Sequence, residues 1–199
     1  EFNLSNALAV WTILLSQGMS SKEAAQKVSQ LHPVLGRMEL IRLGKSHKNE
    51  GLLAVVDYAH TPDALEKTLQ ALRPIAEQRG GKIWCVFGCG GDRDAGKRAL
   101  MGAVAERNAD QVLITSDNPR SEDPQVIMQM IRSGMKEDAQ NIQMIADRAA
   151  AIMAAIRNAD PRDIVLVAGK GHETTQEING KKFDFSDQEH IVLEAGGSV

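Results

Sequence analysis

The chain has 199 residues, of which 43% are hydrophobic and 25% charged, and its formal net charge at pH 7 is −3. This composition is typical of a globular protein and excludes the disordered, collagen-like and disulfide-scaffold classes. No segment carries a run of basic residues, so we expect no nucleic-acid partner.

The most apolar stretch, Ala7 to Leu15, is too short to predict a membrane span, because a spanning helix needs roughly 20 apolar residues. No basic region followed by an apolar stretch and a small-residue cleavage site is recognisable, so we expect no export signal and a cytoplasmic protein. Cys85 and Cys89 form C-x-x-x-C, which is neither a redox pair nor a convincing half of a zinc site. We therefore expect two reduced thiols and no metal site.

The first 35 residues have the periodicity of helices. Residues 4–17 predict a helix that ends at Gly18, with five apolar side chains on one stripe: Leu4, Leu8, Trp11, Leu14 and Leu15. Ser20 or Ser21 is expected to cap a second helix that reaches about Leu31. Residues 32–36 break the pattern. We place a domain boundary there, between residues 1–35 and 36–199.

From Arg37 onward, short apolar runs alternate with longer amphipathic segments. Strands are predicted over residues 52–57, 83–88, 111–115, 141–145 and 164–168, with a further edge strand over 38–43 and a hairpin loop over 44–51. Helices are predicted near residues 62–79, 97–108, 124–137 and 147–158. This alternation predicts an α/β, Rossmann-like fold with a mainly parallel sheet flanked by helices.

Ligands of such folds bind at the carboxyl ends of the strands, where this chain has four polar loops. These loops offer Arg93, Asp117, Arg120 and Glu173. Two guanidiniums can hold a carboxylate and two carboxylates can accept from an ammonium, so the set suits the head group of an amino acid. Taken alone, Asp117–Arg120 favours the interpretation as a simple turn, because Asp, Asn and Pro are the usual turn formers.

The next two motifs leave their alternatives open. Gly91–Lys97 fits the G-x-x-x-x-G-K pattern of a phosphate loop, but Arg98 replaces its magnesium-binding hydroxyl, and two aspartates would face the phosphates. A degenerate nucleotide-binding loop and a plain glycine turn both remain possible interpretations, and the plain turn does not explain Arg93. His60 is a candidate base or a backbone-bonded loop histidine, and Thr61 is a candidate helix cap before Pro62.

Six segments in chain order together resemble the Mur ligases. They are Phe2–Asn6 (FNLSN), Gly36–Glu39 (GRME), Val56–Asp63 (VDYAHTPD), Phe87–Asp94 (FGCGGDRD), Asp117–Arg120 (DNPR) and Ala168–Glu173 (AGKGHE). The resemblance implies three domains, of which this chain would contain the C-terminal α/β domain after a helical remnant of the central ATPase domain in residues 1–35. By this resemblance the chain is a fragment, expected to be inactive alone.

The resemblance also implies an ATP-dependent reaction in peptidoglycan precursor synthesis. ATP would phosphorylate the D-glutamate carboxylate of UDP-N-acetylmuramoyl-L-alanyl-D-glutamate, and the amine of meso-diaminopimelate would attack the acyl phosphate. Magnesium ligands would lie outside the chain, and the enzyme would be a monomer. A non-catalytic amino-acid-binding module is the rival interpretation.

Residue roles follow from the matching motif positions. The resemblance assigns meso-diaminopimelate binding to Arg93, Asp117, Asn118, Pro119, Arg120, Gly169 and Glu173. It assigns nucleotide contacts to Asn3, Asn6, Arg37, Asp57 and His60.

Overall fold

The computed structural model describes residues 2–31, 34–43 and 50–194. The chain divides into two compact units, residues 1–34 and 35–199. Each unit is described by itself. The hairpin loop predicted over residues 44–51 lies outside the described residues except for its last two positions.

The first unit consists of α1 (Phe2–Ser16) and α2 (Ser21–Val28). Ser20 caps α2 as one of the two predicted serines, because its hydroxyl accepts from Glu23 N at 3.3 Å while the Glu23 carboxylate accepts from Ser20 N at 3.2 Å. Leu8 and Leu15 of the predicted apolar stripe are exposed. Trp11 and Leu14 of the same stripe are half-buried, so the unit covers this stripe only in part.

The second unit is built on one sheet with the strand order β1-β2-β6-β3-β4-β5. Its strands are β1 (Glu39–Arg42), β2 (Leu53–Asp57), β3 (Ile83–Phe87), β4 (Gln111–Ile114), β5 (Ile142–Met144) and β6 (Ile164–Ala168). The edge strand β1 pairs with β2 antiparallel, and the other pairs are parallel. The predicted strands and the predicted α/β class are confirmed.

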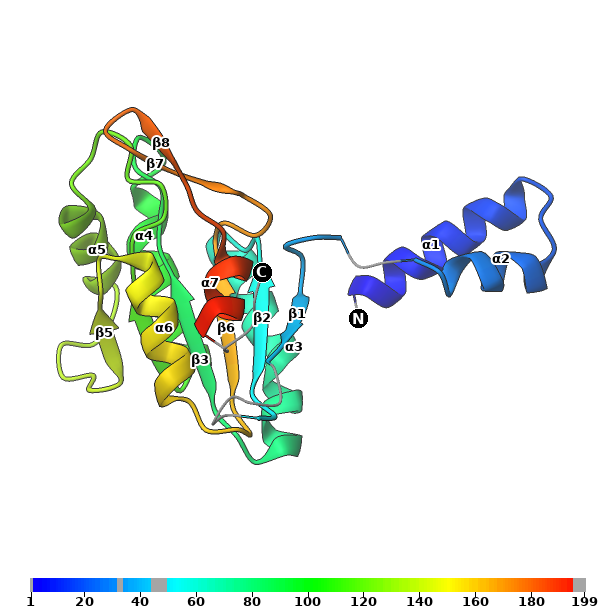
Figure 1. The fold of residues 1–199 in the computed structure, drawn as a ribbon, viewed down its shortest axis with the longest axis horizontal. Helices are drawn as coiled ribbons and strands as arrows, with labels where there is room; N and C mark the ends of the chain where they lie inside the picture. Colours follow the sequence, from blue (N-terminus) through cyan, green and yellow to red (C-terminus); the bar gives the residue numbers. More distant parts are fainter. Residues whose placement is uncertain (1, 32–33, 44–49, 195–199) are drawn as a thin grey trace. The chain divides into compact units, whose positions relative to one another are not determined.

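Helices cover both faces of this sheet (Figure 1). One face carries α3 (Pro62–Arg79), α4 (Gly96–Asn108) and α5 (Pro124–Arg132), and the other carries α6 (Arg148–Asn158) and α7 (Asp187–Glu194). The central strand β6 shows why both faces need cover. Ile164 and Leu166 pack on the first face, Val165 and Val167 on the second, and all four are 0% exposed.

Three elements were not predicted from the sequence, and the helix predicted over residues 124–137 is shorter in the structure. The hairpin of β7 (Thr175–Ile178) and β8 (Lys181–Asp184) lies at the end of the sheet toward which the parallel strands point (Figure 1). Its strands are polar and partly or fully exposed, so they lack a buried apolar run. Helix α7 is similarly polar, and α5 ends at Arg132 instead of 137.

The segment before β1 is held against the loop that follows β6. Gly36 has a φ of +66°, and a Cβ there would lie 2.2 Å from His172 N, so no side chain fits. Gly36 N donates to Glu39 Oε2 at 2.7 Å, and Gln188 Nε2 donates to the same oxygen at 3.0 Å. Gly36 and Glu39, both in the GRME motif, therefore hold the segment before β1 against the loop that follows β6.

Candidate amino-acid pocket

A pocket of about 440 Å³ lies at the carboxyl ends of β2, β3, β4 and β6. The four polar loops predicted to meet there do meet. The lining residues are Tyr58, His60, Thr61, Gly90, Arg93, Asp94, Lys97, Asp117, Asn118, Arg120, Gly169 and Glu173. They include every residue assigned to the amino acid from sequence except Pro119.

Asp117 supplies a buried carboxylate to this pocket. The residue is 8% exposed, and its Oδ1 accepts no hydrogen bond in the described part of the chain. Its closest cation is the Lys170 ammonium, whose Nζ lies 3.7 Å from Oδ1. Burial raises the pKa of Asp117, although the Arg148 guanidinium and Lys170 oppose this. A buried acceptor without a donor is a site that a ligand donor can satisfy.

Glu173 and Asn118 form a hydrogen-bonded group beside Asp117. Asn118 Nδ2 donates to Glu173 Oε2 at 2.8 Å, and Lys170 Nζ donates to the same oxygen at 3.1 Å. Burial alone would raise the pKa of Glu173, but these contacts outweigh it and lower the pKa. Glu173 is therefore ionised at neutral pH.

The basic side of the pocket consists of two arginines in different states. Arg120 Nη1 donates to Gly91 O at 2.7 Å, and its Nε lies 3.3 Å from Glu177 Oε2, which fixes the plane of the guanidinium. Arg93 is exposed and forms no ion pair with any described residue. One cation is thus held in place and the other is free to meet a ligand.

The β7–β8 hairpin, which the sequence analysis missed, supports the Asp117–Arg120 loop. Arg120 N donates to Glu177 O at 3.0 Å and Glu177 N donates to Asn118 Oδ1 at 2.9 Å. Gln176 Nε2 donates to Asp117 O at 2.7 Å. Arg120 has a φ of +52°, a strained backbone state that these contacts hold. The one available sequence signal was Asn179-Gly180, both with positive φ at the hairpin turn.

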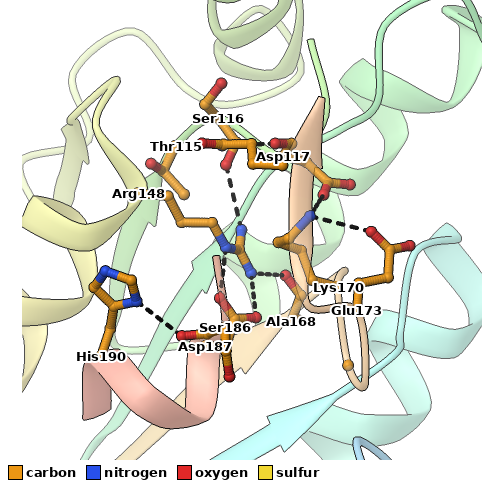
Figure 2. A network of polar contacts seen from close by, with 12 residues as sticks. Thr115, Ser116, Asp117, Arg148, Ala168, Lys170, Glu173, Ser186, Asp187 and His190 are labelled. Atoms are coloured by element: carbon orange, nitrogen blue, oxygen red, sulfur yellow. Dashed lines mark hydrogen bonds and ion pairs between the residues drawn. The ribbon is translucent and has the colours of Figure 1, made fainter. Parts of the chain in front are cut away.

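A buried ion pair lies behind the pocket (Figure 2). Arg148 donates to Asp187 from Nε at 2.7 Å and from Nη2 at 2.8 Å, and both side chains are 0% exposed. Arg148 Nη2 also donates to Ala168 O at 3.0 Å. Burial lowers the pKa of Arg148, but the Asp187 carboxylate outweighs this and raises it. The pair ties α6 and α7 to the strand end from which Lys170 follows.

The structure contradicts the interpretation of Gly91–Lys97 as a phosphate loop. Gly91 N donates to Asn118 O at 2.9 Å, Asp92 N to Glu122 Oε1 at 2.6 Å and Gly96 N to Asp94 Oδ1 at 2.8 Å, so these amides are already used. A Cβ at Gly91 would lie 1.9 Å from Pro119 O, which shows that this glycine serves a close backbone approach. Lys97 Nζ donates to His60 O at 2.6 Å.

Arg98, which replaces the hydroxyl of a true phosphate loop, stabilises the same turn. It is 1% exposed and donates to Glu122 from Nη1 and Nη2, at 2.8 Å each. The hydrogen bonds from Arg98 lower the pKa of Glu122 to about 2. The glycine turn and this ion pair account for the motif without a nucleotide.

The residues assigned to nucleotide contacts are spread over both units. Asp57 is 7% exposed, and its carboxylate accepts from Met38 N and Ala59 N at 2.8 Å and from Thr68 Oγ1 at 3.3 Å, so it already holds the chain locally. Arg37 lies 4.6 Å over the Tyr58 ring. His60 Nδ1 lies 2.8 Å from Tyr58 O, which supports the backbone-bonded alternative for this histidine.

Asn3 and Asn6 lie on α1, in the first unit, and Asn6 is exposed. Thr61 caps α3 as predicted, since its hydroxyl accepts from Ala64 N at 3.3 Å. Within the described ranges, no three His, Cys, Asp or Glu side chains are grouped so that they could hold a metal ion. None of the described helices is long and apolar enough to cross a membrane.

Comparison with known proteins supplies the family. Residues 36–171 match the family described as "Mur ligase, glutamate ligase domain". The chain belongs to the Mur ligase family. A protein of Ralstonia nicotianae named UDP-N-acetylmuramoyl-L-alanyl-D-glutamate–2,6-diaminopimelate ligase is 59% identical over 192 residues, which are 96% of this chain and 36% of that protein.

Solved structures agree with this assignment. A structure titled as a UDP-N-acetylmuramoyl-L-alanyl-D-glutamate–2,6-diaminopimelate ligase matches 98% of this chain and 38% of its own, with 39% identity and a TM-score of 0.74. The UDP-N-acetylmuramate-alanine ligase of Thermotoga maritima matches 85% of this chain and 34% of its own, with 21% identity and a TM-score of 0.63. The second likeness shows the shared fold. This chain spans about a third of the length of the relatives it matches.

Proposed function

We propose that the pocket binds meso-diaminopimelate for an ATP-dependent ligase that joins it to UDP-N-acetylmuramoyl-L-alanyl-D-glutamate. The observation that carries this proposal is the buried Asp117 Oδ1, which accepts no hydrogen bond from a described residue, in a pocket that Arg93 and Arg120 also line. The printed names of the Ralstonia nicotianae protein and of the solved structure support the choice of amino acid.

The charges of the pocket match one end of this substrate. An ammonium would donate to Asp117 and Glu173, and a carboxylate would accept from Arg120 and Arg93. Lysine has the terminal ammonium without the neighbouring carboxylate, so the N–H groups of the half-buried Arg120 that Gly91 O and Glu177 do not engage would gain no carboxylate acceptor. Both effects favour meso-diaminopimelate, and Asn118, Pro119 and Gly169 shape the loops between these charges.

The rest of the reaction requires groups beyond this pocket. ATP would supply the phosphate that converts the D-glutamate carboxylate into an acyl phosphate, which the amine then attacks with release of phosphate. Arg37 and His60 flank Tyr58 at the edge of the pocket and would meet the nucleotide. Asp57 would act by holding the backbone of Met38, next to Arg37. Asn3 and Asn6 would lie near the adenine, and Mg²⁺ would be held outside the described residues.

The domain assignment and the setting belong to the same proposal. Residues 1–35 would be the closing helices of a central ATPase domain, and residues 36–199 the C-terminal domain that brings the amino acid. The enzyme would act as a cytoplasmic monomer. Light scattering on the purified ligase tests the monomer, and a dimer mass would contradict it.

A chimera tests the activity directly. This chain replaces the matching third of the Ralstonia nicotianae ligase, and kcat/KM is measured for meso-diaminopimelate and for lysine. We expect turnover with a strong preference for meso-diaminopimelate. We expect Arg120→Ala to lower kcat/KM for meso-diaminopimelate by about 10- to 100-fold and to change kcat/KM for lysine little. A chimera that folds and prefers another amino acid would contradict the proposal.

A further inference from the structure

A buried lysine contacts three of the residues that line the pocket but does not line the pocket itself. Lys170 follows β6 and is 0% exposed, with its ammonium directed between the side chains of Asp117 and Glu173 (Figure 2). Nζ donates to Asn118 Oδ1 and to Glu173 Oε2, both at 3.1 Å, and it lies 3.7 Å from Asp117 Oδ1. All three partners line the pocket. A fully buried ammonium is costly unless such partners compensate it.

These contacts fix the orientation of the Asn118 amide. Its Oδ1 accepts from Lys170 Nζ and from Glu177 N, so its Nδ2 must face Glu173, to which it donates at 2.8 Å. Two donors on one side thus decide which end of the amide faces the carboxylate. Loss of the Lys170 ammonium would leave only the backbone donor of Glu177 to hold this orientation.

Lys170 also balances part of the negative charge beside it. Asp117 and Glu173 are two carboxylates that interact through space, and the ammonium between them leaves these three side chains with one net negative charge. Without the ammonium, two like charges would compete and one carboxylate would take a proton. A protonated carboxyl donates a hydrogen bond, whereas the ammonium of an amino acid needs an acceptor.

We propose that Lys170 is a positioning residue that presets Asp117, Asn118 and Glu173 to accept one ammonium group of the incoming amino acid. The inference rests on the proposed function, because it takes the amino acid as the ligand of this pocket. Lys170 acts through its three partners and does not touch the ligand. Lys170 lies in the loop after β6, so its ammonium charge lies near the carboxyl ends of β6 and of its neighbour β3.

Two guanidiniums near this cluster are bound to carboxylates outside it. The further charged or titratable side chains that line the cavities around it are Tyr58, His60, Arg93, Asp94, Lys97, His172 and Lys182. Arg148 faces Asp117 from α6 but is bound to Asp187 of α7, and Arg120 faces Glu173 while it contacts Glu177 of the hairpin. Each of these guanidiniums has its own carboxylate. Among the described side chains, Lys170 is the one that donates hydrogen bonds to both Asn118 and Glu173.

The experiment has two arms. In the first, the carboxyl carbons of Asp117 and Glu173 are titrated by NMR in the 199-residue chain without ligand, as wild type and as Lys170→Met. We expect Glu173 to titrate at higher pH in the variant. In the second, the chimeric ligase is assayed: we expect Lys170→Met to raise KM for meso-diaminopimelate about 10- to 100-fold and to change kcat by less than about threefold.

The pH profile separates positioning from general destabilisation. In Lys170→Met, kcat/KM for meso-diaminopimelate should rise with pH through the raised pKa of Glu173, because only the ionised form accepts the ammonium. Asp163→Asn is the matched control: Asp163 is 4% exposed and accepts from Trp84 Nε1 at 2.9 Å, at the opposite end of the strands. It should lower stability and leave KM and the profile unchanged. Lys170→Gln, which keeps a donor, replaces Lys170→Met if the latter does not fold.

Each outcome decides the inference. A shifted Glu173 titration together with a raised KM and the new pH profile supports it. An unshifted titration, or a shifted titration with unchanged KM, overturns it. Failure of the proposed function is distinguishable, because the wild-type chimera would then not use meso-diaminopimelate although the ligand-free titration would still respond to Lys170→Met.

Discussion

Two buried aspartates lie at the carboxyl ends of two strands of the same sheet, and the structure uses them differently. Asp57 is the last residue of β2 and accepts from Met38 N, Ala59 N and Thr68 Oγ1. Asp117 follows β4, and neither of its carboxylate oxygens accepts a hydrogen bond from a described residue. The first carboxylate is saturated by its own chain and holds a turn, whereas we propose that the second binds a ligand. Burial alone therefore does not determine whether an aspartate is saturated by its own chain.

The largest loss of unfolding free energy is expected when the buried Arg148–Asp187 ion pair is broken. Arg148→Met would leave Asp187 buried without its partner and should lower the free energy of unfolding by about 3–5 kcal/mol. Urea denaturation measures this loss. The double variant Arg148→Met/Asp187→Leu should recover much of it, because no unpaired charge remains. A single variant as stable as the wild type would show that the pair does not support this end.

The next effect separates the two aspartates themselves. Asp57→Ala removes the acceptor of two backbone amides and one hydroxyl and should cost about 2–4 kcal/mol of unfolding free energy. Asp117→Asn should cost less, because Asp117 accepts no hydrogen bond from a described residue and loses only its 3.7 Å ion pair with Lys170. Equal losses in the two variants, measured by the same denaturation, would remove the distinction between them.

A smaller effect appears in the pH dependence of stability. Burial raises the pKa of Asp117 in the folded chain, so the folded state binds more protons than the unfolded state in the range above 3.8. Its contribution therefore makes stability fall as pH rises from 3.8 to the raised folded value. Asp117→Asn should remove this slope.

Glu122 serves as the opposite case. Its pKa is lowered from 4.5 to about 2 by Arg98, so its contribution is present above 4.5 and is lost as pH falls toward 2. Glu122→Gln should remove this loss of stability at acid pH. Denaturation at several pH values checks both signs, and slopes of the same sign for Asp117 and Glu122 would contradict the account.

The smallest effect concerns the hairpin. Glu177→Gln should keep the backbone contacts of β7 but weaken the hold on Arg120 Nε. We expect the preference of the chimera for meso-diaminopimelate over lysine to fall by about three- to tenfold. Exposed Lys181→Gln on β8 is the control and should leave the preference unchanged. A loss of selectivity in the control alone would place the determinant elsewhere.

The sequence predicted the sheet because its strands are continuous apolar runs bounded by polar loops. The residues of β6, Ile164–Ala168, are all buried, and no other element type suits such a short run between turns. The sequence also predicted that the loops with Arg93, Asp117 and Glu173 lie close together, because parallel strands bring their carboxyl ends to one edge of the sheet. The polar strands β7 and β8 and helix α7 offered no such run.

The states of individual polar residues could not be predicted. Lys170, between two glycines, is typical of an exposed loop, and its complete burial depends on Asn118 and Glu173, which only the folded chain brings to it. The saturation of Asp57 and the unpartnered oxygen of Asp117 likewise depend on donors supplied, or withheld, by distant segments. Hydrogen-bond partners are tertiary facts that a local pattern does not contain.

We propose that Asp117, Asn118, Glu173 and Arg120 together form an amino-acid receptor in which Asp57 takes no part. Titration of the isotope-labelled chain with meso-diaminopimelate, followed on the Asn118 amide, the Arg120 Nε–H and the aspartate carboxyl carbons, tests it directly. We predict saturable shifts at Asn118, Arg120 and Asp117, none at Asp57, and weaker shifts with lysine. Shifts at Asp57 with none at Asp117, or equal responses to both amino acids, would contradict the account.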